Sequence, residues 1–284
     1  MIDLHTHSSA SDGSLTPRQL IAEAHSRGIS AIALTDHDTI DGNDEAAAAA
    51  DTLGIHFIPG IELEIQWEPG EFHLLGLGIK NPSGDFLEAL RTIAEIRKQR
   101  NLGILEKMQE MGISADYGDI KAMSEGNTIG RPHFAAFLVE RRVVKNREQA
   151  FSRYLGKGRP LYIPKEGLAF RRAVEMIKES GGIAVLAHPM SLYVSWGRLP
   201  GLIADLKDQG LDGIEAWHPT AKPRACKRLE ELGLRLGLYI SAGSDFHGAS
   251  RPDRKLGISS GGRKIEDSVL EAIPPLHSSA DNIS

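Results

Sequence analysis

The chain has 284 residues and a net charge of −5, from 33 lysine and arginine residues against 38 aspartate and glutamate residues. This balance argues against a protein that coats nucleic acid indiscriminately, because such proteins carry a global excess of basic residues. The sequence has no apolar run near the roughly 20 residues of a membrane span and no signal peptide at its start. We therefore expect a cytoplasmic protein without a membrane role, and nothing in the sequence indicates a protein partner.

Short runs rich in β-branched residues alternate with longer segments of helical period, which is typical of βα units around a parallel sheet or barrel. The first predicted helix begins at Pro17, with Thr16 as N-cap and Gly28 after the last turn. Seven strands are predicted, over residues 2–4, 31–35, 56–61, 72–79, 183–187, 213–217 and 238–242. Further helices are predicted over residues 42–52, 169–180, 199–209 and 221–232.

The alternation breaks once, between about Gly84 and Leu161, where helical segments follow one another without a strand. Helices are predicted there over residues 89–111, 131–139 and 147–154. We therefore predict an α/β fold, a distorted (βα)7 barrel built from residues 1–100 and 165–284. An inserted all-helical subdomain, residues 101–164, is expected to cap the substrate. The chain after Pro275 is expected to be loose.

One stretch of the insertion, from Glu140 to Arg159, is basic despite the overall negative charge. Two acids, Glu140 and Glu148, stand against seven basic residues, Arg141, Arg142, Lys145, Arg147, Arg153, Lys157 and Arg159. Either these side chains form a solvated helix face, or they attract a polyanionic substrate towards a nearby site.

Histidines and carboxylates gather where the predicted strands end. Six of the seven strands carry one at or just beyond the C-terminal end, the end where βα barrels build their active sites, and the fourth carries His73 within it. His5 and His7 are two apart on an extended strand, so their side chains point the same way. The other residues are Asp12, His37, Glu62, His188, Glu215, His218, Asp245 and His247. Because Cys226 is the sole cysteine, a metal ion here must be held by nitrogen and oxygen.

These motifs resemble the polymerase and histidinol phosphatase (PHP) family. The resemblance covers residues 1 to about 95 and 165 to 250, and it rests on His5-Thr6-His7 with Ser11-Asp12-Gly13, Thr35-Asp36-His37-Asp38, Pro59-Gly60-Ile61-Glu62, Ala187-His188-Pro189 and Gly243-Ser244-Asp245-Phe246-His247. It implies a seven-stranded barrel and a trinuclear cluster bridged by Glu62 and Asp245. The implied metal ligands are His5, His7, Asp12, His37, Glu62, His73, His188, Asp245 and His247.

Nine ligands are too many for one ion, so we expect two or three divalent ions. A nitrogen and oxygen set suits Mn²⁺, Zn²⁺ or Fe²⁺, and the family resemblance favours Mn²⁺. Ions of this kind activate a bridging hydroxide and stabilise charge on a phosphoryl group, so phosphoester hydrolysis is the expected reaction. The predicted catalytic residues, which are also predicted ligands, are Asp12, His37, Asp245 and His247.

Recognition of a second phosphate needs further cations, since arginine matches phosphate geometry. Candidates for substrate binding are Arg97, Arg100 and Asn101 on the long helix, Arg131 and His133 at the start of an inserted helix, and Lys165 after the insertion. For Arg97 and Arg100, a solvated helix face is an equal alternative. Glu215 and His218 could pack or could orient a ligand. His25, His56 and His277 are read as structural or exposed.

Within the family, the chain resembles stand-alone bacterial members that remove the 3′-phosphate of 3′,5′-nucleoside bisphosphates, such as adenosine 3′,5′-bisphosphate. That small nucleotide is the leading substrate hypothesis, with Arg131 and His133 anchoring the 5′-phosphate. One alternative is a 5′-3′ exoribonuclease that acts on short 5′-phosphorylated RNA. Another is a histidinol-phosphate phosphatase, which has no need for a basic insertion. A metal-binding module without activity is disfavoured because the ligand set is complete.

Overall fold

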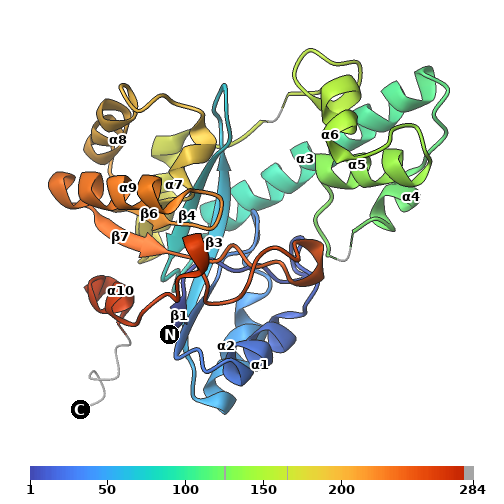
Figure 1. The fold of residues 1–284 in the computed structure, drawn as a ribbon. Coiled ribbons are helices and arrows are strands. Elements are labelled where there is room, and N and C mark those ends of the chain that lie inside the picture. Colours follow the sequence, from blue (N-terminus) through green and yellow to red (C-terminus); the bar gives the residue numbers. More distant parts are fainter. Residues whose placement is uncertain (125, 165, 278–284) are drawn as a thin grey trace.

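Seven strands form one sheet in the computed structural model, which describes residues 1–124, 126–164 and 166–277. Their order in space is their order in the chain, and each predicted strand is confirmed. The strands are β1 (Ile2–Asp3), β2 (Ala31–Leu34), β3 (His56–Ile65), β4 (Phe72–Leu77), β5 (Ile183–Leu186), β6 (Gly213–Trp217) and β7 (Tyr239–Ala242). The segments after β1 and β7 meet, because the amide of Leu4 donates to the carbonyl of Ala242 at 3.3 Å and Thr6 bridges to Phe246. The sheet therefore curls into a nearly closed barrel (Figure 1).

The direction of β4 differs from the sequence-based expectation. Neighbouring strands are parallel except that β4 pairs antiparallel with both β3 and β5. The pattern of βα units did not predict this reversal, which arises because a short hairpin rather than a helical crossover joins β3 to β4. As a result, the beginning of β4, with His73 as its second residue, lies at the same end of the barrel as the C-terminal ends of the parallel strands.

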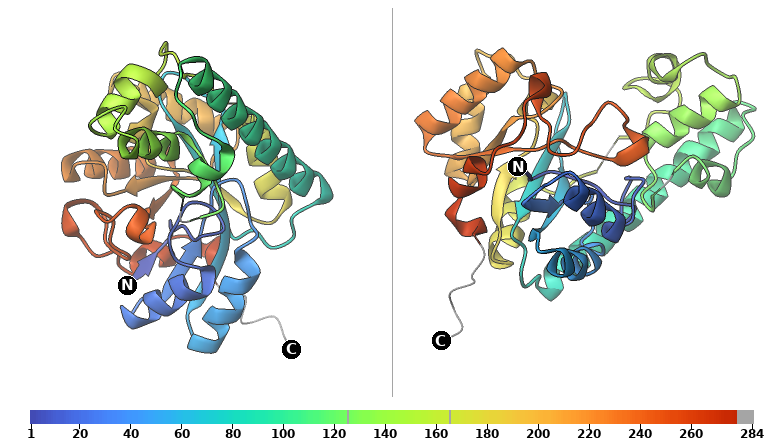
Figure 2. Two further views of the ribbon diagram at one scale, coloured as in Figure 1. Left: turned by 90° about the vertical axis from the view of Figure 1, so that its right-hand side faces the viewer. Right: turned by 60° about the horizontal axis from the view of Figure 1, so that its bottom comes forward.

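Amphipathic helices cover the barrel. They are α1 (Pro17–Ser26), α2 (Asn43–Leu53), α7 (Phe170–Glu179), α8 (Leu199–Asp208), α9 (Pro223–Leu236) and α10 (Ser268–Glu271). The N-cap of α1 is as predicted: Thr16 accepts from the amide of Gln19, whose side chain accepts from the amide of Thr16. Helices α7, α8 and α9 lie on the side away from the inserted helices (Figures 1 and 2). None of the described helices combines the length and the hydropathy of a membrane span.

Helices are the only named elements in the described part of the region between β4 and β5. It contains α3 (Gly84–Glu110), α4 (Tyr117–Lys121), α5 (Arg131–Glu140), α6 (Arg147–Ala150) and a π-helical turn (Phe151–Leu155). Helix α3 starts beside the barrel and runs out into the insertion, so it crosses the predicted boundary at residue 101 without a break (Figure 2). The inserted helices have a hydrophobic core of their own, which includes Ile104, Met108, Phe134, Phe137, Leu138 and Leu155. This separate core supports our proposal that residues 101–164 form a subdomain.

Two predictions fall partly outside the described residues. Lys165, a candidate for phosphate binding, is one of them, and the chain end from residue 278 is the other.

The seven basic side chains between Glu140 and Arg159 are all exposed. With acids in the described part of the chain, Arg141 makes an ion pair to Asp119 at 3.3 Å and Lys157 makes one to Glu68.

Candidate metal centre and active site

The barrel brings the predicted ligands together at one end. Donor atoms of candidate ligands form four groups, and within each group the atoms lie within 4.8 Å of one another. Eight of the nine predicted ligands belong to these groups, together with Glu215 and His218. The ninth, His188, has its Nε2 3.0 Å from Oε1 of Glu62. The groups are His7, Asp12, His37 and His247; His5, His7 and Asp245; His5, Glu215 and His218; and His37, Glu62 and His73. Because His5, His7 and His37 each belong to two groups, the groups are continuous and form one centre.

The spacing around Glu62 is that of atoms that share an ion. Its Oε2 lies 3.3 Å from Nε2 of His5 and 3.2 Å from Nε2 of His7. These two imidazole nitrogens are 3.1 Å apart, and Oδ1 of Asp245 is 3.6 and 3.4 Å from them. Ligand bonds of about 2.0–2.2 Å place two ligands of one ion about 3–3.5 Å apart. Each of the two carboxylates therefore has the spacing of a group that shares an ion with His5 and His7.

Glu62 and Asp245 each face more than one group. The second oxygen of Glu62, Oε1, is 2.9 Å from Nδ1 of His73 and 3.0 Å from Nε2 of His188. Oδ1 of Asp245 is 3.4 Å from Nδ1 of His247, whose Nε2 is 3.2 Å from Oδ1 of Asp12. A carboxylate with ligands on both sides could serve two adjacent cations and offset their repulsion, the role that the family resemblance implies for these two residues.

Buried polar atoms without partners test whether ions fit here. Among the described residues, Oε2 of Glu62, Nδ1 of His7, Nε2 of His218 and Nε2 of His247 are buried and make no hydrogen bond. An unsatisfied buried polar atom costs about 1–3 kcal/mol, so four in one place fit a site whose ligands bind ions. Since all the donors are imidazole nitrogens and carboxylate oxygens, the residues fit a centre of several divalent ions.

The carboxylates of the centre are charged. Burial disfavours ionisation of Glu62, but the surrounding imidazoles, with His37 and His73 foremost, hold its pKa well below the ordinary range. Burial also opposes the charge of His7 and His73. The adjacent carboxylates of Asp245 and Glu62 nevertheless raise the pKa of His7 to about 9, and the charge of Glu62 raises that of His73 to about 10. Metal binding must therefore displace protons from these imidazoles.

Two buried carboxylates that were not among the predicted site residues hold the ligand loops. Asp36 accepts hydrogen bonds from the amide of Ser8 at 2.8 Å and from the hydroxyls of Ser8 and Ser11 at 2.6 and 2.5 Å. These bonds fix the turn that carries Asp12. In the same way, Asp3 accepts from the amides of Ser244 and Gly257 at 2.9 and 2.7 Å. Burial raises the pKa of Asp3 to about 6.

The backbone is unusual at three positions after strands. Asp38, His188 and Asp245 have positive φ values of 52°, 27° and 53°. Such values cost non-glycine residues about 1–3 kcal/mol and persist where the surroundings enforce them. Here the amide of Asp38 donates to the carbonyl of Glu62, and the amide of Asp245 donates to the carbonyl of His5, both at 2.9 Å. The strained turns direct His188 and Asp245 into the centre and Asp38 towards Arg97.

A cavity of about 170 Å³, here called the central cavity, opens on the centre. It brings three predicted ligands together with four of the five predicted substrate-binding residues. The residues concerned are Asp12, His37, His73, Arg97, Arg100, Arg131 and His133. Nε of Arg100 is buried without a partner among the described residues, whereas Arg97 is paired with Asp38.

Asn101 does not reach the central cavity. Its side chain is 1% exposed, and its Nδ2 donates to the carbonyl of Ile129 at 3.0 Å. The amide therefore ties α3 to the segment before α5. The helical spacing that places Arg97 and Arg100 beside the centre directs Asn101 elsewhere, to the wall of a neighbouring cavity that lies along α3.

Arg251 also lines the central cavity and was not predicted. Its Nη1 lies 3.1 Å from Oδ2 of Asp245, and Nη2 of Arg254 lies 3.9 Å from the same oxygen. Figure 2 shows the segment after β7 extending towards the inserted helices. The signal in the sequence was the Arg251-Pro252-Asp253-Arg254 run directly after the last ligand motif.

Comparisons with known proteins agree with this geometry. The sequence model of the PHP domain matches residues 3–159. A 5′-3′ exoribonuclease of Haemophilus influenzae is 37% identical over 245 residues, 86% of this chain and 89% of that protein. A 3′,5′-nucleoside bisphosphate phosphatase of Chromobacterium violaceum is 36% identical over 264 residues, 90% of each chain. The structure of an amidohydrolase from Chromobacterium violaceum with bound sulfate and no metal has a TM-score of 0.83 and 33% identity, over 95% of this chain and 96% of that one. The chain therefore belongs to the PHP domain family.

Proposed function

We propose that this protein, a metal-dependent phosphoesterase of the PHP domain family, removes the 3′-phosphate from 3′,5′-nucleoside bisphosphates with Mn²⁺ as cofactor. Adenosine 3′,5′-bisphosphate would yield AMP and inorganic phosphate. The observation that carries the proposal is the central cavity, which joins ligands of the metal centre to a set of arginines. A substrate with two phosphates fits such a site, since one phosphate can face the metals and the other the arginines.

The metal ligands would be His5, His7, Asp12, His37, Glu62, His73, His188, Asp245 and His247. When bound, divalent ions supply Lewis acidity towards water and the phosphoryl group. Water adds to phosphorus, the bond from phosphorus to the 3′-oxygen breaks, and the nucleoside keeps a 3′-hydroxyl. Arg251, which lies beside Asp245, is placed to bind a phosphoryl oxygen at this end of the cavity.

The 5′-phosphate would bind at the other end, to Arg100, Arg131 and His133. Arg97 is less suited to this role because Asp38 already compensates its charge. Burial together with the charge of Arg100 lowers the pKa of Arg97 to about 10. A substrate anion would relieve this repulsion between neighbouring guanidinium groups. The relative named as a 3′,5′-nucleoside bisphosphate phosphatase supports the same substrate class.

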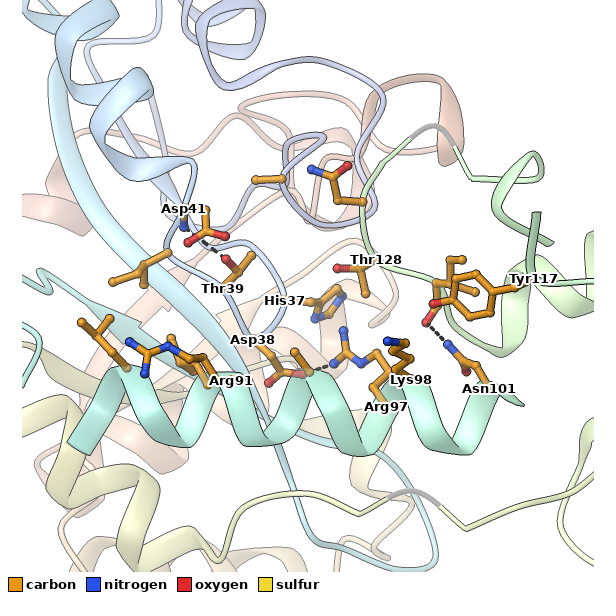
Figure 3. A pocket seen from close by; sticks show the side chains of 17 residues that line it. His37, Asp38, Thr39, Asp41, Arg91, Arg97, Lys98, Asn101, Tyr117 and Thr128 are labelled. Atoms are coloured by element: carbon orange, nitrogen blue, oxygen red, sulfur yellow. Dashed lines mark hydrogen bonds and ion pairs between the residues drawn. The ribbon is translucent and has the colours of Figure 1, made fainter. Parts of the chain in front are cut away.

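A second cavity favours the exoribonuclease as the alternative function. This α3 cavity has a volume of about 400 Å³ and shares His37, Arg97, Thr128 and Ile129 with the central cavity. Figure 3 shows it between α3 and the 37–41 segment, with Arg91 and Lys98 on α3 and Asp41 opposite. It offers room for a strand that continues beyond the phosphate at the metals. The relative named as a 5′-3′ exoribonuclease supports this reading.

A phosphate-release screen with Mn²⁺ separates the candidates. The panel contains nucleoside monophosphates and bisphosphates, 5′-phosphorylated oligoribonucleotides and histidinol phosphate. Preference for the bisphosphate supports the proposal, and stepwise release of mononucleotides supports the exoribonuclease. A preference for histidinol phosphate would overturn both, because its single phosphate leaves Arg100 and Arg131 without a counterpart.

A further inference from the structure

A third cavity, of about 710 Å³, lies between the β3–β4 hairpin and the insertion. We call it the hairpin cavity. It shares Glu64, Glu71, Arg131 and Phe151 with the central cavity. The two spaces are therefore lined in part by the same side chains, and a ligand held at Arg131 has access to both.

Aromatic side chains from both sides line the hairpin cavity. They are Trp67, Phe151, Tyr162 and Tyr193. Trp67 is held in place, because its Nε1 donates to the carbonyl of Leu192 at 3.2 Å and its ring meets Phe72 edge to face at 5.8 Å. The ring of Tyr162 lies 5.7 Å from the guanidinium of Arg131. Tyr193 is 76% exposed, which is unusual for a large aromatic side chain.

The charges of the hairpin cavity do not suit a phosphate. Glu64, Glu68 and Glu71 line it on the hairpin side, against Arg131 and Lys157 on the side of the insertion. Lys157 is paired with Glu68, so its charge is compensated. A flat, uncharged group is therefore the better occupant, whereas phosphates are directed to the arginines of the central cavity. Aromatic rings that stack on bases are a common device for holding single nucleotides.

We infer that the hairpin cavity is the base-binding subsite of the enzyme, in which Trp67 and Tyr162 hold the nucleobase of the nucleotide whose phosphates bind in the central cavity. This inference rests on the proposed function for its substrate. The subsite explains how an enzyme whose metals recognise any phosphate distinguishes nucleotides from sugar phosphates.

The test compares binding of 5′-AMP and ribose 5-phosphate to the Mn²⁺-loaded protein by calorimetry. The two ligands share the ribose and the 5′-phosphate, and AMP cannot lose a 3′-phosphate. We expect AMP to bind about 10–100-fold more tightly, in line with base stacking at other sites. Trp67→Ala should remove most of this difference in affinity and leave the affinity for ribose 5-phosphate unchanged. Arg131→Ala should weaken the binding of both ligands.

Tyr193→Ser is a second variant, because a side chain that is 76% exposed contributes little packing to the fold. This variant should lower the affinity for AMP a few-fold and leave the affinity for ribose 5-phosphate unchanged. Equal affinity for AMP and ribose 5-phosphate would overturn the inference, as would equal effects of Trp67→Ala and Tyr193→Ser on both ligands. The binding experiment does not depend on turnover. A protein that binds AMP through Trp67 but releases no phosphate from the bisphosphate would refute the proposed reaction and leave the subsite standing.

Discussion

The carboxylate of Glu215 contacts two candidate ligands at once. Its Oε1 lies 3.0 Å from Nδ1 of His5, and its Oε2 accepts from the amide of His188 at 2.8 Å. With Nδ1 engaged in this way, His5 presents Nε2 to Glu62 and His7. Glu215 thus has the geometry of a residue that orients a metal ligand, one of the two roles that the sequence left open for it.

Glu215→Gln should lower metal affinity about 10–100-fold, the usual effect of removing a carboxylate behind a ligating histidine. Titration of chelator-stripped protein with Mn²⁺ measures this. Glu179→Gln, at an exposed position in the last turn of α7, is the matched control and should bind as the original protein does. Unchanged affinity in Glu215→Gln would show that the contact to His5 has no role in metal binding.

His7→Ala and Asp245→Ala should abolish hydrolysis and reduce the bound metal. Both side chains lie in the group with His5, so each loss opens the same ion site. Elemental analysis and phosphate release measure the two effects in parallel. His25→Ala, on the exposed face of α1, should change neither. Normal turnover in either ligand variant would refute the assigned centre.

Arg100→Ala and Arg131→Ala should each raise KM for a 3′,5′-nucleoside bisphosphate about 10–100-fold, because each loses charged hydrogen bonds to the 5′-phosphate. The same variants should act almost normally on a nucleoside 3′-monophosphate, which has no 5′-phosphate. Arg153→Ala, in the exposed basic stretch, is the control for a general loss of positive charge. Equal losses of activity on both substrates would show that the two arginines do not bind the 5′-phosphate.

Lys98→Glu tests whether the α3 cavity takes a longer substrate. Lys98 is exposed on α3 and lines that cavity but not the central one. Reversal of its charge should slow hydrolysis of a 5′-phosphorylated oligoribonucleotide several-fold, most strongly at low salt. Hydrolysis of the bisphosphate should be unaffected. If oligonucleotide turnover is insensitive to this change, the strand does not follow the α3 cavity.

His56 gives the protein a pH-dependent stability that is unrelated to the metal centre. Burial, followed by the charge of His277, lowers the pKa of this half-buried side chain in the folded protein. The unfolded chain therefore binds the proton more readily, so the contribution is present above the ordinary pKa of about 6.5 and is lost as pH falls through the lowered value. Thermal melts at pH 7.5 and 5.5 should show a smaller drop in Tm for His56→Gln than for the original protein. The same drop in Tm in both proteins would contradict a role of His56 in the pH dependence of stability.

Much of the fold was predictable from the sequence because each strand is a short, buried apolar run with turn residues at its ends. The direction of β4 was not predictable, because the pattern of apolar residues along a strand is the same whichever way the strand runs. The reversed direction of β4 places His73, near the start of its strand, beside ligands that come after the C-terminal ends of the other strands.

The candidate ligands could also be located, because short motifs place them at strand ends. The residues that hold those motifs were harder to find. Asp3 and Asp36 act through hydrogen bonds to distant backbone, and Arg251 reaches Asp245 only through the folded loop. The cavity that Asn101 lines could not be read from the sequence, because one step along a helix turns a side chain by about 100°. Here that step separates the central cavity from the α3 cavity.

The most direct test of the central claim is hydrolysis of adenosine 3′,5′-bisphosphate by the Mn²⁺-loaded protein, with AMP and inorganic phosphate measured together. We predict equal amounts of the two products, no reaction after chelation, and recovery when Mn²⁺ is restored. Absence of metal-dependent phosphate release, or adenosine 3′-phosphate in place of AMP, would contradict the account.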